Sequence, residues 1–156
     1  MLTLQIPGFK QMELAYLVCD FNGTLAKDGK LYQEVISLLN ELSLDLKLYL
    51  LSADTYGNIQ EESKKLNATV KIISAQNQDY TKQQFVKQLG SQQVIAIGNG
   101  RNDSMMLSEA ALGIAVIEEE GCAVAAINSA DIVVSGIKHA LELLINPTRM
   151  IATLRS

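Results

Sequence analysis

The stretch AYLVCDFNGTL, residues 15–25, joins a short apolar run to a polar turn that begins at Asp20. The run from Ala15 to Cys19 has the length and composition of one buried strand. Gly23 permits a tight backbone turn just after it, and Thr24 adds a hydroxyl. A carboxylate at the end of a strand beside such a turn suits a nucleophile. Asn-Gly is also an ordinary turn dipeptide, so this stretch alone equally describes a plain loop.

Outward from this stretch, apolar runs alternate with helical patterns along the chain. Further strands are expected at 46–51, 70–73, 94–97, 112–116 and 132–134, and helices at 31–42, 55–66, 82–90, 106–111 and 137–145, the last broken by Pro147. Such alternation predicts an α/β domain with three layers, Rossmann-like, in which a mostly parallel sheet carries helices on both faces. Before it, LTLQI and MELAYLV flank Pro7-Gly8 and predict an N-terminal hairpin that could add an antiparallel edge.

Bulk composition excludes several classes of protein. The 156 residues fit one domain, 1–156, and 48% are hydrophobic, enough for a sizeable core. The net charge is -4 and no basic patch is present, which argues against binding to nucleic acid. No segment approaches the roughly 18 uninterrupted apolar residues of a membrane span, and no signal peptide is evident. Cys19 and Cys122 lack metal-ligand spacing with His139, a residue expected on a surface helix. We therefore expect a cytoplasmic protein with two reduced, buried thiols.

Polar residues that follow the strands are the candidates for a site, because ligands of open α/β sheets bind beyond the carboxyl ends of the strands. These polar segments are residues 20–24, 52–55, 78–82 and 98–103. Ser52 follows the second strand of this core, and GNGRND at 98–103 follows the fourth. Asn99 and Asp103 bring oxygen ligands of the kind that Mg²⁺ prefers. The alternative is a loop that caps the next helix. Lys82 is expected in the first turn of a helix whose N-terminal end attracts anions, although a solvated surface lysine would look the same.

Several motifs in order resemble one superfamily. DFNGTL at 20–25 resembles the first motif, Asp-x-Asp-Gly-Thr, of haloacid dehalogenase-like (HAD) proteins, and GNGRNDSMML at 98–107 resembles their last. LSADT at 51–55, KQQFVKQLG at 82–90 and the segment 112–134 are similar to the phosphorylation domain of P-type ATPases. The resemblance covers residues 15–134 and is strongest to the free-standing "soluble P-type ATPase" group. It implies a HAD fold without a cap domain, since only AKDGKL, a flap-like segment, and one helix separate Asp20 from Ser52.

The resemblance also implies a chemistry. Asp20 would take a phosphoryl group from a phosphorylated substrate whose identity the sequence does not name, with Lys82 beside it. The phosphate-binding positions match Thr24, Ser52, Ala53 and Lys82, and the Mg²⁺ positions match Asp20, the carbonyl of Asn22, Asn99 and Asp103. Phosphoryl transfer depends mostly on positioning and charge stabilisation, which this residue set provides.

Two departures from the family pattern leave two functions open. Asn22 replaces an aspartate that protonates the leaving group and later activates water, a contribution of roughly 10²–10⁴ in rate. Asn99 replaces a metal-ligating aspartate. The sequence therefore predicts a slow Mg²⁺-dependent phosphohydrolase or, alternatively, an attenuated phosphate-binding or regulatory module, including a partner of a membrane pump. An open site without a cap suits a bulky substrate, or a homo-oligomer whose neighbouring copy acts as the lid.

Overall fold

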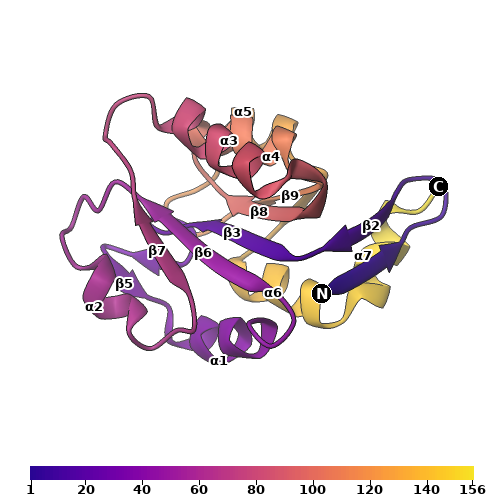
Figure 1. Cartoon of the computed structure of the whole chain (residues 1–156), viewed down its shortest axis with the longest axis horizontal. Coiled ribbons are helices and arrows are strands. Elements are labelled where there is room, and N and C mark those ends of the chain that lie inside the picture. Colours follow the sequence, from indigo (N-terminus) through magenta and orange to yellow (C-terminus); the bar gives the residue numbers. More distant parts are fainter.

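Six parallel strands form the central sheet of the computed structural model, which describes residues 1–156 (Figure 1). Their order is β10-β9-β8-β3-β6-β7, with β3 (Tyr16–Asp20), β6 (Lys47–Ser52), β7 (Thr69–Ile72), β8 (Val94–Gly98), β9 (Leu112–Val116) and β10 (Ile132–Val134). The chain adds β6 and β7 on one side of β3 and then crosses to add β8, β9 and β10 on the other. The reversal of strand order therefore lies between β3 and β8, where ligands of such sheets bind.

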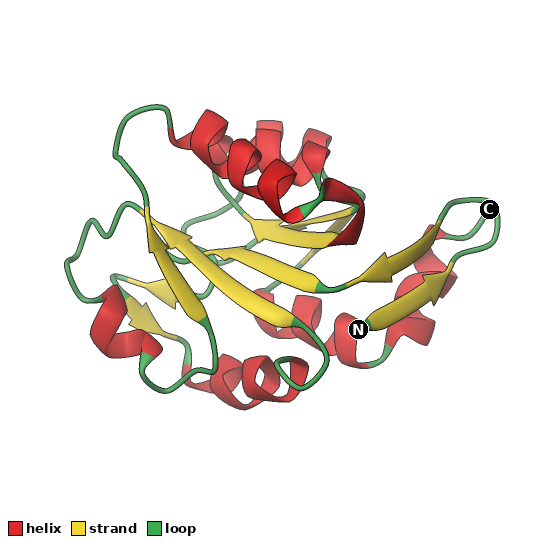
Figure 2. Cartoon of the chain, in the orientation of Figure 1, coloured by secondary structure: helices red, strands yellow, loops and turns green.

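Helices cover both faces of this sheet, as predicted (Figures 1 and 2). One face carries α1 (Gln33–Leu42) and α6 (Ile137–Ile145), and the other carries α3 (Gln78–Leu89), α4 (Ser104–Glu109) and α5 (Val124–Ser129). The side chains of β3 alternate between the faces, so Leu17 and Cys19 join a cluster of 30 buried residues while Val18 joins a second cluster of 11. The three-layer α/β architecture is thereby confirmed.

The predicted N-terminal hairpin is present, but it does not extend the main sheet. Strands β1 (Leu2–Gln5) and β2 (Gln11–Leu14) pair only with each other, and β1 packs near α7 (Pro147–Leu154). The hairpin leads into β3 through the single residue Ala15. Because β3 is central and pairs with β6 and β8, a hairpin that continues from it has no free sheet edge to join. The expected antiparallel edge is therefore wrong.

A second small hairpin follows Asp20. It consists of β4 (Ala26–Lys27) and β5 (Lys30–Leu31) and corresponds to the flap-like segment expected from the sequence. The backbone N–H groups of Thr24, Leu25 and Ala26 all donate to the carbonyl of Phe21, which closes the turn tightly. No cap domain stands between Asp20 and β6. Across the whole chain, no helix combines the length and apolar character needed to cross a bilayer.

The helix expected over 55–66 is mostly loop. Only α2 (Ile59–Ser63) is helical, because Asp54 and Gly57 adopt positive φ of 52° and 70°. The Asp54 carboxylate accepts a hydrogen bond from the Ile59 N–H at 3.1 Å, which stabilises this loop instead of a longer helix. The helix expected over 106–111 ends at Glu109, short of Ala110 and Ala111.

Two helices were not predicted, although each has a simple cause. Pro147 ends α6 as expected, but it also begins α7 at the first helical position, where its fixed φ and missing N–H are tolerated. Helix α5 lies in a stretch of small residues with no strong apolar periodicity. Both are short and gain their stability from packing. Helix α7 does carry an apolar stripe of Met150, Ile151 and Leu154, but the predicted helical pattern stopped at Pro147.

The tight packing of α4 on β9 gives a first prediction. A Cβ built on Gly113 would overlap the backbone carbonyl oxygen of Leu107, and backbone cannot move aside as a side chain can. We expect Gly113→Ala to lower the free energy of unfolding by about 1–3 kcal/mol, the usual cost of overpacking. Urea denaturation measures this. Unchanged stability would mean that α4 and β9 are not in such close contact.

Candidate active site

A crevice of about 290 Å³ opens at the carboxyl ends of the central strands. Its lining includes Asp20 and Asn22 after β3, Ser52, Ala53 and Thr55 after β6, Asn99, Gly100 and Asn102 after β8, Gln78 at the start of α3, and Glu120 after β9. Five of the predicted site residues, Asp20, Asn22, Ser52, Ala53 and Asn99, thus line one crevice at the reversal of strand order. The other three, Thr24, Lys82 and Asp103, are buried beneath it.

A buried ion triad forms the floor of the crevice. The Lys82 Nζ lies 2.6 Å from an oxygen of Asp20 and 2.7 Å from an oxygen of Asp103. Lys82 and Asp103 are 1% and 0% exposed, so this lysine is not a solvated surface residue. Helix α3 begins at Gln78, four residues earlier than expected, which places Lys82 in its second turn. Lys82 is therefore not at the N-terminal end of the helix, and its contribution to the site is the positive charge of its ammonium group.

The triad carries one net negative charge when all three groups are ionised. Burial disfavours the Lys82 ammonium, but Asp20 and Asp103 outweigh burial and raise its pKa, so Lys82 stays protonated. Burial, with the nearby Asp103 charge, raises the pKa of Asp20 to about 7, while Lys82 and the hydrogen bond from Thr24 work against this rise. The Asp20 carboxylate is therefore undercompensated, and a further cation beside it would favour its ionised form.

Asp103 has both oxygens committed to protein donors. One pairs with Lys82, and the other accepts the backbone N–H groups of Asn99 at 3.0 Å and Gly100 at 2.8 Å. A Cβ on Gly98 would lie 2.5 Å from the Asp103 carboxyl carbon, so only glycine allows this approach. Asp103 thus holds the loop after β8 in place, as the capping alternative anticipated. Its role beside a metal ion stays a prediction.

Acceptor oxygens converge above the triad and outnumber the available donors. The Thr24 hydroxyl lies 3.2 Å from an Asp20 oxygen and 3.2 Å from the Asn99 side-chain oxygen, yet it has one proton to donate. The Asn22 side-chain oxygen is buried without a hydrogen-bond partner. No three His, Cys, Asp or Glu side chains form a metal cluster. A mixed set of carboxylate and amide oxygens nonetheless fits Mg²⁺, which binds few protein ligands and keeps several waters.

Hydrogen-bond donors for a phosphate are present on the β6 side. The Ser52 oxygen accepts the Asp54 N–H at 2.8 Å, which leaves the hydroxyl proton free to point into the crevice. Ala53 lines the crevice beside it. The Thr24 hydroxyl instead contacts Asp20 and Asn99 from below, so its predicted contact with phosphate stays a prediction.

Glu120 is the crevice residue that the sequence reasoning missed. Gln78, Thr55 and Asn102 belong to the polar segments singled out after the strands, and Asn102 donates to Gln78 at 2.8 Å along one wall. Glu120 follows β9, a strand that was predicted, but the residues after it were read only as a family-like segment. Applying the same rule to this strand end would have found it.

The two cysteines and the histidine do not line the crevice. Cys19 is buried, but Cys122 is only half-buried, so the expectation of two buried thiols holds for one of them. Burial raises the pKa of both thiols. His139 is exposed on α6, as predicted for a surface helix.

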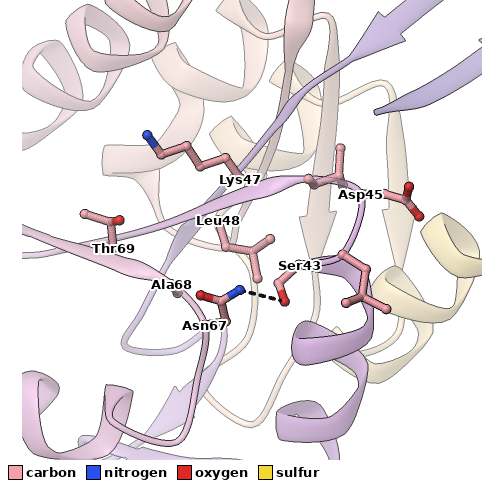
Figure 3. Close-up of a pocket in the computed structure, with 9 residues that line it drawn as sticks. Ser43, Asp45, Lys47, Leu48, Asn67, Ala68 and Thr69 are labelled. Carbon is pink, nitrogen blue, oxygen red and sulfur yellow. Dashed lines mark hydrogen bonds between the residues drawn. The ribbon is translucent and has the colours of Figure 1, made fainter.

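Another hollow, of about 350 Å³, lies at the opposite edge of the sheet (Figure 3). It is lined by residues 43–48 and 67–69, which lead into β6 and β7 and include the first residues of both strands. The Asn67 side-chain amide donates to the Ser43 hydroxyl there at 3.3 Å. This hollow collects no set of converging carboxylates, and it is at the amino ends of the strands, where ligands of open α/β sheets do not bind.

The triad generates a prediction about stability. Lys82→Met would leave two buried carboxylates without their cation, and breaking a buried ion pair from one side typically costs about 3–5 kcal/mol. We expect urea denaturation to show a loss of that size. The matched control is Lys87→Met on the same helix, where the side chain is 47% exposed and pairs with Glu109 at 3.7 Å. Equal stability of the two variants would mean that Lys82 does not neutralise buried charge.

Comparison with known proteins finds similarities in sequence and in fold. A family model described as haloacid dehalogenase-like hydrolase matches residues 78–128, which include Lys82, Asn99 and Asp103. An uncharacterised protein of Methanocaldococcus jannaschii is 47% identical over 73 residues, which make up 47% of this chain and 78% of that protein.

Solved structures share the fold at low identity. The 3-deoxy-D-manno-octulosonate 8-phosphate phosphatase of Moraxella catarrhalis, in complex with magnesium ion, phosphate ion and a KDO molecule, is 20% identical, with a TM-score of 0.69 over 91% of this chain and 94% of that chain. The cobalt-bound deoxy-D-mannose-octulosonate 8-phosphate phosphatase of Haemophilus influenzae is 12% identical, with a TM-score of 0.70 over 92% and 90%. A phosphoserine phosphatase of T. onnurineus is 16% identical, with a TM-score of 0.62 over 86% and 96%. With the family match and the fold in agreement, the chain belongs to the haloacid dehalogenase-like hydrolases.

Proposed function

We propose that the chain is a slow, Mg²⁺-dependent phosphohydrolase that forms an aspartyl-phosphate on Asp20. The observation that carries the proposal is the Asp20 carboxylate, held 2.6 Å from the buried Lys82 ammonium at the floor of a crevice where Ser52 can donate a hydrogen bond. A carboxylate fixed in this way is positioned for in-line attack on phosphorus. The family membership and the fold shared with three phosphate-ester phosphatases support the same reaction class.

In the first step, a new bond forms between Asp20 and phosphorus while the bond from phosphorus to the ester oxygen breaks. Lys82 keeps the carboxylate oriented and balances part of its charge, and Ser52 donates to a phosphoryl oxygen. The Asn22 amide is not acidic enough to protonate the leaving oxygen, so this oxygen takes its proton from solvent. In the second step, water attacks phosphorus, the bond from phosphorus to the Asp20 oxygen breaks, and inorganic phosphate leaves with the Asp20 carboxylate regenerated. The proton lost by the water passes to solvent, because Asn22 is not a base.

The residues that would hold Mg²⁺ are Asp20, the carbonyl of Asn22 and the amide oxygen of Asn99. When bound, the ion would neutralise the phosphoryl oxygens and lower the repulsion between phosphate and the Asp20 charge. Related folds are known with magnesium and with cobalt ions. Asn99 contributes oxygen without charge, so binding at this site is expected to be weak.

The crevice is open, and an adjoining hollow gives room for the rest of a substrate. That hollow has about 370 Å³ and shares Gln78 and Asn102 with the crevice. Arg101 lies on its wall and makes no ion pair within the chain. Because Asp79 lines the same hollow, Arg101 gives it no net positive charge, and the hollow offers room for the rest of a phosphate ester without selecting its charge. A homo-oligomer whose neighbouring copy closes the open side is a further part of the proposal.

The second candidate function is an attenuated phosphate-binding or regulatory module, including a pump-associated partner. Asn22 and Asn99 favour it, because each replaces a carboxylate of the family pattern. The retained triad opposes it: a module that only bound phosphate would gain nothing from a buried, undercompensated Asp20. The two candidates differ in whether Asp20 becomes covalently modified.

Covalent modification supplies the test between them. Attack on acetyl phosphate needs little acid assistance because acetate leaves easily, whereas hydrolysis of the adduct needs a base. We therefore expect a phosphoryl adduct to accumulate with Mg²⁺, detected by intact mass, and to be absent in Asp20→Asn. Asn22→Asp should restore the base and raise steady-state turnover by roughly 10²–10⁴. No adduct, together with no gain from Asn22→Asp, would favour the regulatory module.

Metal affinity gives a separate prediction. Asn99→Asp restores a carboxylate where the amide oxygen now faces Thr24, and an added negative charge should tighten Mg²⁺ binding by about tenfold or more. Isothermal titration calorimetry on the two proteins measures the change. Equal or weaker binding by Asn99→Asp would remove Asn99 from the set of metal-binding residues.

A further inference from the structure

Glu120 lies at the mouth of the crevice, on the loop at 117–123 that follows β9. It is the last of three consecutive glutamates, and the other two have partners. Glu118 accepts the N–H of Ile137 at 2.6 Å, and Glu119 pairs with Lys27 of the flap. Glu120 makes no hydrogen bond and no ion pair within the chain, although it lines the same crevice as Asp20, Asn22 and Asn99.

Two hydrogen bonds fix the loop at 117–123 to Asn99, one of the candidate metal-binding residues. The Asn99 side-chain amide donates to the Gly121 carbonyl at 3.1 Å, and the Ala123 N–H donates to the Asn99 carbonyl at 2.8 Å. The Gly121 N–H donates to the Glu118 carbonyl at 2.8 Å, which closes the turn that presents Glu120. The side chain of Glu120 is free, but its backbone is placed by Asn99.

Gly23 shows how near the two side chains come to one another. A Cβ built at Gly23 would lie 2.5 Å from a carboxylate oxygen of Glu120, and 2.8 Å and 3.1 Å from the side-chain nitrogen and oxygen of Asn99. The Glu120 carboxylate and the Asn99 amide therefore approach one point at the turn after Asp20. The absence of a side chain at Gly23, whose φ is 80°, keeps that point open.

The negative charge at this point favours a cation over an anion. The triad below already carries one net negative charge, and an unpaired carboxylate at the mouth would repel a phosphate group further. A divalent cation between Glu120 and Asp20 reverses this effect.

We infer that Glu120 supplies the second carboxylate of the divalent-cation site and replaces the charge missing at Asn99. The contact is made directly or through one of the waters that Mg²⁺ retains. This inference rests on the proposed function for the presence of the cation, but it concerns affinity and not turnover. It deepens that function by naming a residue outside the family motifs.

The test compares two variants that remove the same charge from neighbouring positions. Glu120→Gln should weaken Mg²⁺ binding by roughly 10–100-fold, the range typical of lost outer-shell partners of a metal. Glu119→Gln, which loses only an exposed pair with the flap, should bind as the parent protein does within about twofold. Calorimetry measures Mg²⁺ affinity without any substrate. Electron paramagnetic resonance measures Mn²⁺ affinity in the same way, because it detects the free ion. Circular dichroism checks that both variants fold.

A rescue completes the experiment. Asn99→Asp added to Glu120→Gln should recover most of the lost affinity, because it returns one carboxylate to the same point. Equal affinities of Glu120→Gln and Glu119→Gln would overturn the inference, as would a parent protein that binds neither ion. If Glu120→Gln weakens Mg²⁺ binding as expected but acetyl phosphate gives no adduct, the inference about Glu120 is supported and the proposed hydrolase activity is refuted. If the adduct forms but Glu120→Gln leaves Mg²⁺ affinity unchanged, the hydrolase activity is supported and the inference about Glu120 is refuted.

Discussion

The pairing of Lys82 with Asp20 and Asp103 is the interaction on which the site depends. A buried ammonium between two carboxylates fixes three elements at once, since Asp20 ends β3, Lys82 lies in α3 and Asp103 follows β8. Asp103 then extends this order to the backbone of Asn99 and Gly100. Such a cluster is weak evidence for stability, because desolvation offsets much of the attraction. Its value lies in fixing the Asp20 carboxylate beside a cation at the floor of the crevice.

The topology explains why these residues meet. Asp20 and Asn99 end neighbouring strands at the point where strand order reverses, so no helix connection crosses above them. Ser52 arrives from the other neighbour of β3, and Glu120 arrives one strand further out. The sheet therefore supplies acceptor oxygens from one side and a hydroxyl from the other. A cation and a phosphate would each find suitable partners across one crevice.

Much of this arrangement follows from local sequence, and the rest depends on distant packing. Apolar runs such as LKLYLL and VIAI are recognisable because parallel strands are buried on both faces. The length of α2 was missed because it depends on Asp54 accepting the Ile59 N–H, a contact that periodicity does not encode. The burial of Lys82 could not be predicted from the sequence either. A lysine is expected at the surface unless its carboxylate partners are known, and both partners of Lys82 are distant in the chain. Glu120 could have been predicted, because it is a polar residue that follows the end of β9, as the other crevice residues follow the ends of their strands.

Two amides separate this chain from the full family pattern. Asn22 and Asn99 stand where carboxylates would activate water and hold metal, whereas Asp20 and its partner Lys82 are present. The central claim is that Asp20 accepts the phosphoryl group, and a crystal structure with Mg²⁺ and beryllium fluoride tests it most directly, because beryllium fluoride mimics a phosphoryl group on a carboxylate. We expect a trifluoroberyllate bonded to an Asp20 oxygen, with a fluorine near Ser52. A fluoride complex bound elsewhere, or an unmodified Asp20 at saturating beryllium fluoride, would contradict the account.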